Sequence, residues 1–143
     1  MSSNDQIILD LTVEDRRSII APEREADTFF ELFVAEQVLK DYDLSSEGIE
    51  SGHVAGGGDG GADGIYLFVN GELVQEDTDF SSLKSNVAID LTILQAKGQA
   101  GFGETVLDKM YALTADLLNL GTDFDALSAV YNAEVITAMR RFK

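Results

Sequence analysis

The sequence predicts an α/β fold in which a small mixed β-sheet is flanked by helices. Apolar residues recur at helical spacing over residues 22–40, 103–120 and 123–142. Between the first two of these helices lie two runs rich in β-branched and aliphatic residues, 63–69 and 87–97. With 143 residues, 45% of them hydrophobic, the chain is the length of one domain and can form a single core.

The first predicted helix carries two candidate functional carboxylates. Residues 1–21 before it show no clear period. Pro22 suits the first turn of a helix, and the apolar residues that follow cover nearly the whole circumference. We therefore expect a helix that is buried on all sides. Glu31 and Glu36 interrupt its apolar surface, and a buried carboxylate is costly unless it has a partner.

Glycine is concentrated in the middle of the chain. Residues 48–64 hold eight of the 13 glycines and predict a loop or tight strand entry, where the backbone needs positive φ or approaches another group closely. Asn70-Gly71 predicts a tight hairpin turn to a short return strand. Residues 75–86 are polar and predict an exposed loop before the second strand, which we expect to be largely buried. Gly121 is expected to cap the helix before it.

The two predicted strands each have an aliphatic face that becomes polar at one end. Alternation places Asp63 at the start of one such face, and Gln95 and Lys97 at the end of the other. Antiparallel pairing would bring these ends together, and the glutamate-bearing helix could add a carboxylate. Mg²⁺ commonly binds through one or two carboxylates, waters and substrate phosphate, and it activates water for attack on phosphorus. A neighbouring lysine stabilises the charge that develops on the phosphate.

These motifs resemble a known family. GGGDGGADGIY followed by TILQAK resembles the D…QxK signature of Mrr-like nucleases, a branch of the PD-(D/E)XK restriction-endonuclease superfamily. The closer resemblance, over roughly residues 25 to 120, is to the N-terminal domain of AIPR (abortive infection phage resistance) proteins, in which FVAEQVL, DGGADGIYLFVNGELV and ILQAKG occur in the same order. It implies a restriction-endonuclease-like core, and a single domain over residues 1–143 that is the N-terminal part of a longer protein.

The resemblance also implies roles for individual residues. Asp63 corresponds to the metal-binding aspartate, Lys97 to the catalytic lysine, and Gln95 to a metal ligand in place of the usual acidic residue. Glu36 corresponds to the helix glutamate that completes the catalytic and metal-binding set, and Glu31 is its rival because periodicity does not choose between them. Because an amide binds Mg²⁺ more weakly than a carboxylate does, Asp63 and the helix glutamate must supply most of the charge.

The function implied by the resemblance is an enzyme, a Mg²⁺-dependent endonuclease with Mn²⁺ as an alternative metal. It would hydrolyse DNA phosphodiester bonds in cytoplasmic defence against phage, with RNA also open as a substrate. The alternative is a catalytically inactive nuclease-fold module for nucleic-acid docking or protein assembly. Asp59 is either a secondary ligand or a residue that shapes its loop. A further strand expected in this superfamily after the second major helix is not evident in residues 121–143.

Composition restricts the partners, site types and location that the chain can have. Ten basic against 26 acidic residues give a net charge of −16, which opposes phosphate binding, so we expect DNA affinity to depend on other domains, a second copy of the chain, or the metal. No cysteine is present, and the single histidine, His53, is expected to be an ordinary loop residue. No apolar stretch is long enough to span a membrane, which predicts a soluble, intracellular protein. The glycine run leads into a strand rather than a helix, which argues against a dinucleotide site.

Overall fold

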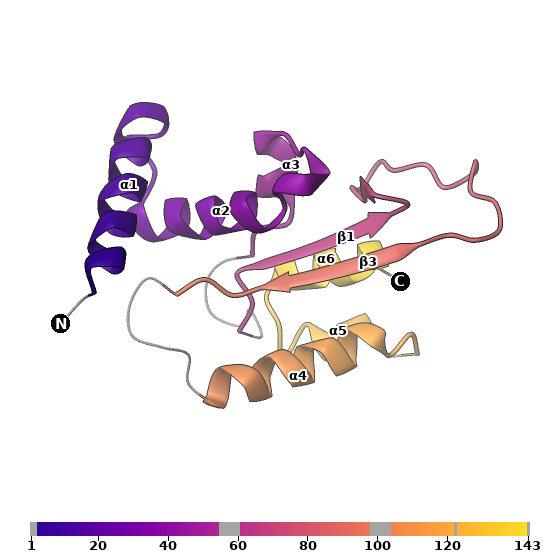
Figure 1. Cartoon of the computed structure of the whole chain (residues 1–143). Coiled ribbons are helices and arrows are strands. Elements are labelled where there is room, and N and C mark those ends of the chain that lie inside the picture. The colour runs from indigo at the N-terminus through magenta and orange to yellow at the C-terminus, as the bar shows by residue number, and fades with distance from the viewer. Residues whose placement is uncertain (1–2, 55–60, 98–103, 122, 143) are drawn as a thin grey trace.

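The computed structural model describes residues 3–54, 61–97, 104–121 and 123–142. In this part of the chain, helices surround a small three-stranded sheet, so the predicted α/β class is confirmed (Figure 1). The helices are α1 (Asn4–Ile20), α2 (Ala26–Val38), the short 3₁₀ helix η1 (Lys40–Tyr42), α3 (Ser46–Ser51), α4 (Glu104–Leu118), α5 (Phe124–Leu127) and α6 (Ala133–Phe142). The strands are β1 (Gly64–Val69), β2 (Glu72–Leu73) and β3 (Ile89–Leu94).

The strands form one antiparallel sheet in the order β2-β1-β3. Asn70 and Gly71 join β1 to β2 with φ values of 53° and 82°, so the predicted hairpin turn is confirmed. β1 pairs with β3 along its whole length, from Gly64 opposite Leu94 onward. All strand pairs among the described residues are antiparallel, so this sheet is not the mixed sheet that the sequence predicted.

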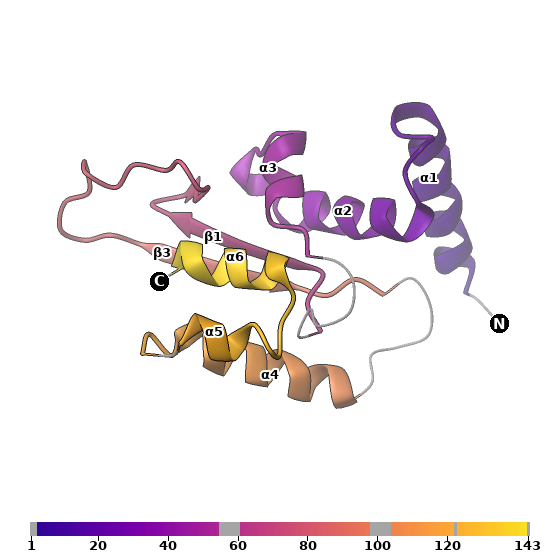
Figure 2. The same cartoon turned by 180° about the vertical axis from the view of Figure 1, so that it is seen from behind.

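Side chains alternate across β1 and divide the core into two clusters. Tyr66 and Phe68 pack against α2 and α3, whereas Ile65 packs against α4, α5 and α6. Figures 1 and 2 show α2 and α3 on one side of the sheet and the C-terminal helices on the other. The sheet is therefore the middle layer between two groups of helices.

β3 is less buried than the sequence predicted. Ile89 and Asp90 are exposed, and the remaining residues of β3 are half-buried. The strand lies at the edge of the sheet, where β1 covers only one of its sides. A run of apolar residues does not reveal whether a strand will be central or at an edge, and the prediction of burial was wrong for that reason.

α1 covers residues whose pattern predicted no element. Val13 is its buried residue, and large aliphatic side chains such as Ile8 and Leu11 are exposed. Its start follows a Ser-x-x-Gln pattern typical of a capping box, in which the Ser3 hydroxyl accepts a hydrogen bond from the backbone N–H of Gln6 at 3.1 Å. The sequence signal for this helix is therefore its N-terminal cap, since its apolar residues do not follow an amphipathic period.

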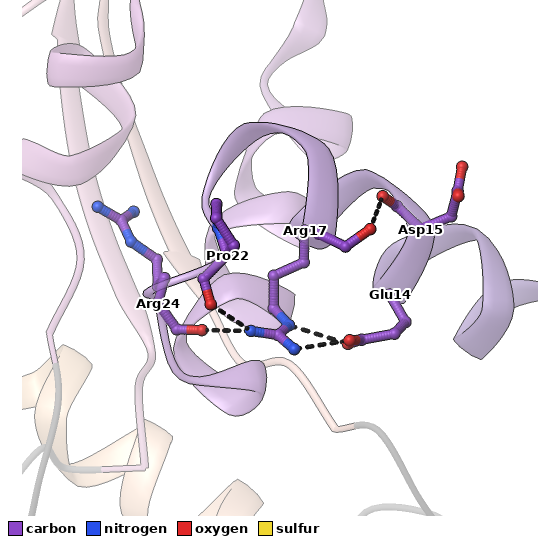
Figure 3. Close-up of polar contacts among 6 residues, drawn as sticks. Glu14, Asp15, Arg17, Pro22 and Arg24 are labelled. Carbon is purple, nitrogen blue, oxygen red and sulfur yellow. Dashed lines mark hydrogen bonds and ion pairs between the residues drawn. The ribbon is translucent and has the colours of Figure 1, made fainter.

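Arg17 fixes the turn between α1 and α2 (Figure 3). Its guanidinium donates hydrogen bonds to the backbone oxygens of Pro22 at 3.2 Å and Arg24 at 2.8 Å, and to the carboxylate of Glu14 at 2.6 Å. The bond from Arg17 lowers the pKa of Glu14 below its ordinary value. Pro22 therefore lies in a turn, and α2 begins at Ala26 rather than at Pro22 as predicted.

α2 is buried on one face only. Phe29, Leu32 and Ala35 are buried, whereas Glu36 and Val38 are exposed. The prediction of all-round burial was wrong, because the helix lies on the outside of the sheet (Figure 1) and its face away from the sheet is partly open to solvent. The helix thus has more apolar side chains than its position in the fold can bury.

The C-terminal region contains two helices where the sequence predicted one. Asn132 interrupts the run, because its side-chain oxygen accepts a hydrogen bond from the backbone N–H of Val135 at 3.0 Å and caps α6. The buried Tyr131 donates its hydroxyl to the carboxylate of Asp116 in α4 at 2.6 Å. α4 itself was predicted, although it ends at Leu118 and Gly121 is not its cap.

Tyr66 is the largest fully buried side chain, and two glycines make room for it. A Cβ atom on Gly52 would lie 2.4 Å from Cε1 of Tyr66, and one on Gly64 would lie 2.7 Å from Cε2. The Tyr66 hydroxyl donates a hydrogen bond to the backbone oxygen of Ile49 at 2.6 Å. At Gly52 and Gly64, the close approach predicted for the glycine-rich segment is therefore an approach to this ring, whereas residues 55–60 of that segment lie outside the described residues.

Gly52→Ala should destabilise the fold by roughly 1–3 kcal/mol, because the added methyl group would overlap the Tyr66 ring in a packed core. Gly48→Ala is the matched control in α3, where an added Cβ meets neighbours no closer than 3.4 Å. Urea unfolding measures the free energy of unfolding of both variants. Equal stability of the two would contradict the close packing of Gly52 on Tyr66.

Tyr66 should also make the fold less stable at alkaline pH. Burial raises the pKa of its phenol above the ordinary value of 10.0, so the fold favours the protonated form. The contribution of the buried, protonated Tyr66 side chain to the free energy of unfolding is complete below about pH 10. It is lost as the pH rises above that value, because Tyr66 can then ionise in the unfolded chain.

Tyr66→Phe removes this ionisation, at a cost of about 1 kcal/mol at pH 8 for the lost hydrogen bond. The variant should lose less stability than the wild type between pH 8 and pH 11 in urea unfolding. The same loss of stability in both proteins would show that Tyr66 does not cause the loss of stability at alkaline pH.

Candidate functional site

The two polar strand ends lie side by side. The antiparallel register continues past β1 and β3 to Asp63 and Gln95 at the same end of the sheet. The backbone N–H of Asp63 donates to the oxygen of Leu94 at 2.7 Å, and the Asp63 Oδ2 accepts from the backbone N–H of Ala96 at 2.8 Å. The Asp63 carboxylate is thus tied to the segment that carries Gln95 and Lys97.

This end of the sheet borders a cleft of about 680 Å³ that α1 and α2 also line. Asp63, Gln95 and Lys97 contribute to one part of its wall, and Glu31 contributes from α2. Three further carboxylates line the cleft from α1 and α2, namely Asp10, Glu14 and Asp27. The cleft therefore combines carboxylates, an amide and the ammonium group of Lys97.

Glu36 lies elsewhere. Its carboxylate accepts a hydrogen bond from Arg16 at 2.8 Å, its side chain is 47% exposed, and it lines a separate cavity of about 370 Å³. Glu31 and Glu36 are five positions apart, which places them about 140° apart around the helix. One face of α2 cannot present both, and the structure places Glu31 rather than Glu36 in the cleft with Asp63.

Glu31 has a partner that the sequence did not reveal. The Nε2 atom of His53 lies 2.6 Å from the Oε2 atom of Glu31, and both side chains are mostly buried. The backbone of His53 forms a bridge to Gly64, the residue after Asp63. The two side chains come from positions 22 residues apart, so no local pattern could have linked them, and sequence reasoning treated His53 as an ordinary loop residue.

The oxygen atoms of the cleft fit a hard divalent cation. The Oε1 atom of Gln95 is buried and accepts no hydrogen bond from the part of the chain that the structure describes. A buried amide oxygen without a donor is costly, and because Gln95 also lines the cleft, a rotation of its side chain would present this oxygen to a cation bound there. The carboxylates of Glu31 and Asp63, which line the same cleft, are the oxygen ligands that Mg²⁺ prefers.

The protein ligands in the cleft are nevertheless few. Among the described residues, no three His, Cys, Asp or Glu side chains come together as a metal-binding group. A cation in this cleft would therefore use the Gln95 amide, water and substrate oxygens besides carboxylates, which is common for Mg²⁺. Asp59, the proposed secondary ligand, lies outside the described residues.

Four arginines near the two ends of the chain, Arg16, Arg17, Arg24 and Arg140, are engaged within the fold. Arg16 and Arg24 form ion pairs of 2.8 Å with Glu36 and Glu50. Arg140 lies over the ring of Phe124, 4.4 Å from its centre. Arg17 holds the α1–α2 turn, so a phosphate would have to compete with structural partners at each of these arginines.

Comparison of the chain with protein-family models, with curated proteins and with solved structures finds no match. No helix in the described ranges is long and apolar enough to cross a membrane.

The bond from Ala96 to Asp63 can be tested in solution. Asp63→Ala should increase amide hydrogen exchange at Ala96 about fivefold, because the loss of a hydrogen bond worth about 1 kcal/mol opens this strand end more often. Asp63→Asn keeps an acceptor oxygen and should retain most of the protection. Unchanged exchange in Asp63→Ala, measured by NMR, would mean that the side chain does not hold the strand end.

Proposed function

We propose that this chain is a metal-dependent nuclease domain that hydrolyses phosphodiester bonds. The observation that carries the proposal is the shared cleft, which is lined by Glu31, by Asp63 and by the segment that holds Gln95 and Lys97, three parts of the chain that are far apart in sequence. The buried, unpartnered Gln95 oxygen supports a cation at this point. Glu31 takes the role of helix glutamate, for which the resemblance suggested Glu36.

Each side chain has a chemical role in this proposal. Asp63, Glu31 and the Gln95 oxygen would hold Mg²⁺, or Mn²⁺ in its place. When bound, such a cation would supply Lewis-acid polarisation of a phosphoryl oxygen and would activate a water molecule as the nucleophile. Lys97, exposed at the cleft wall, donates hydrogen bonds to a phosphate oxygen and stabilises the negative charge that develops there.

The biological setting is proposed from the resemblance to AIPR proteins. It suggests DNA as the substrate, with RNA as the second choice, and cytoplasmic defence against phage as the context. It also suggests a restriction-endonuclease-like core and a longer protein with further domains. The net charge of −16 and the engaged arginines favour substrate binding that depends on those domains, on a second copy of the chain, or on the metal.

Lys97→Ala tests the catalytic assignment. The variant should cleave plasmid DNA in Mg²⁺ at least about 100-fold more slowly than the wild type, because the charge on the phosphate loses its stabilising donor. Lys84→Ala is the matched control, since Lys84 is an exposed lysine in the loop between β2 and β3. Equal cleavage by Lys97→Ala and Lys84→Ala would remove Lys97 from the mechanism.

One observation favours a second candidate function, a nuclease-fold module without activity. The described residues offer no group of three acidic or histidine ligands, and an amide stands in place of one carboxylate. This candidate predicts no cleavage by the wild-type chain or by the longer protein, in Mg²⁺ or in Mn²⁺. Metal-dependent cleavage that is lost in Asp63→Asn would exclude it.

A further inference from the structure

We propose that His53 is a positioning residue, which holds the carboxylate of Glu31 in place for a divalent cation in the cleft. The inference rests on the proposed function and adds a residue that neither the motif nor the resemblance includes. His53 does not itself line the cleft, whereas Glu31 does. Its effect would therefore act through Glu31.

The contact has the geometry of a charge-assisted hydrogen bond. The Nε2–Oε2 distance is 2.6 Å, and the side chains of His53 and Glu31 are only 14% and 23% exposed. A neutral imidazole that carries its proton on Nε2 donates to the carboxylate, and a bond to an ionised acceptor is stronger than one between neutral groups. His53 is the one hydrogen-bond partner of the Glu31 side chain within the described residues.

The backbone around His53 is fixed to the strand that carries the other carboxylate. Val54 donates its N–H to the backbone oxygen of Asp63 at 3.1 Å, and Ile65 donates to the oxygen of Gly52 at 2.8 Å. His53 itself bridges to Gly64. The imidazole thus links α2 to the start of β1, so that the positions of Glu31 and Asp63 depend on each other.

Such a link matters because a glutamate side chain has several rotatable bonds. When one carboxylate oxygen is held by His53, the side chain loses less conformational freedom on binding a cation, and the second oxygen stays available as a ligand. Partners that orient a metal ligand in this way are commonly worth about 10- to 100-fold in metal affinity. The same range is expected for His53.

Calorimetric titration of the full chain with Mn²⁺ alone tests the proposal without measuring activity. His53→Ala should weaken Mn²⁺ binding about 10- to 100-fold. His53→Gln should recover most of the affinity, because its amide nitrogen can donate from a position close to that of Nε2. Glu50→Gln is the control, since it removes a nearby ion pair to Arg24 that does not line this cleft.

A double variant separates positioning from a general effect on folding. If His53 acts through Glu31, adding His53→Ala to Glu31→Gln should weaken Mn²⁺ binding little further. Thermal unfolding without metal shows whether each variant is folded. If His53→Ala is unfolded, the comparison of His53→Gln with Glu31→Gln decides, and a His53→Gln variant that is folded but binds Mn²⁺ as weakly as Glu31→Gln overturns the proposal.

The outcomes distinguish this inference from the proposed function. Wild-type Mn²⁺ affinity in His53→Ala, together with a large loss in Asp63→Asn, would overturn the positioning role and leave the metal site standing. Equal affinity in the wild type, Asp63→Asn and His53→Ala would overturn both proposals.

Discussion

The antiparallel register between β1 and β3 is the constraint on which the candidate site depends. Because Gly64 lies opposite Leu94, the next residues outward are Asp63 and Gln95, and their side chains reach one cleft. Side chains alternate between faces, so a slip of one residue would send Ile65 and its neighbours to the wrong cluster. The packing of the core thus enforces the register that the site requires.

The same register places Tyr66 between the sheet and the helices α2 and α3. Its ring lies against Gly52 and Gly64, and its hydroxyl reaches Ile49. These contacts hold Gly52 close to the sheet, and His53 is the next residue along the chain. The buried ring therefore acts on the cleft indirectly, because the position of the histidine relative to Glu31 depends on how closely the glycines pack.

Electrostatics shape what the cleft can bind. Carboxylates from α1, from α2 and from Asp63, the residue before β1, line it, and Lys97 is the one basic side chain that the described residues contribute to its wall. A cation reduces the mutual repulsion of such carboxylates, whereas a bare phosphate would add to it. Several arginines that could attract nucleic acid hold helices and turns together instead. Cation binding is thus the step that would make the cleft receptive to a phosphodiester.

The sequence by itself determined the α/β class, the hairpin at Asn70-Gly71, the helices α2 and α4, and the convergence of Asp63 with Gln95, because these follow from side-chain period and turn chemistry. It did not determine α1, whose aliphatic residues show no single face, or the break at Asn132. The tertiary structure decided between Glu31 and Glu36, and it brought His53 to Glu31. The choice between the glutamates depends on which face of α2 meets the sheet, and the contact with His53 joins segments 22 residues apart. Only packing sets both of these relations.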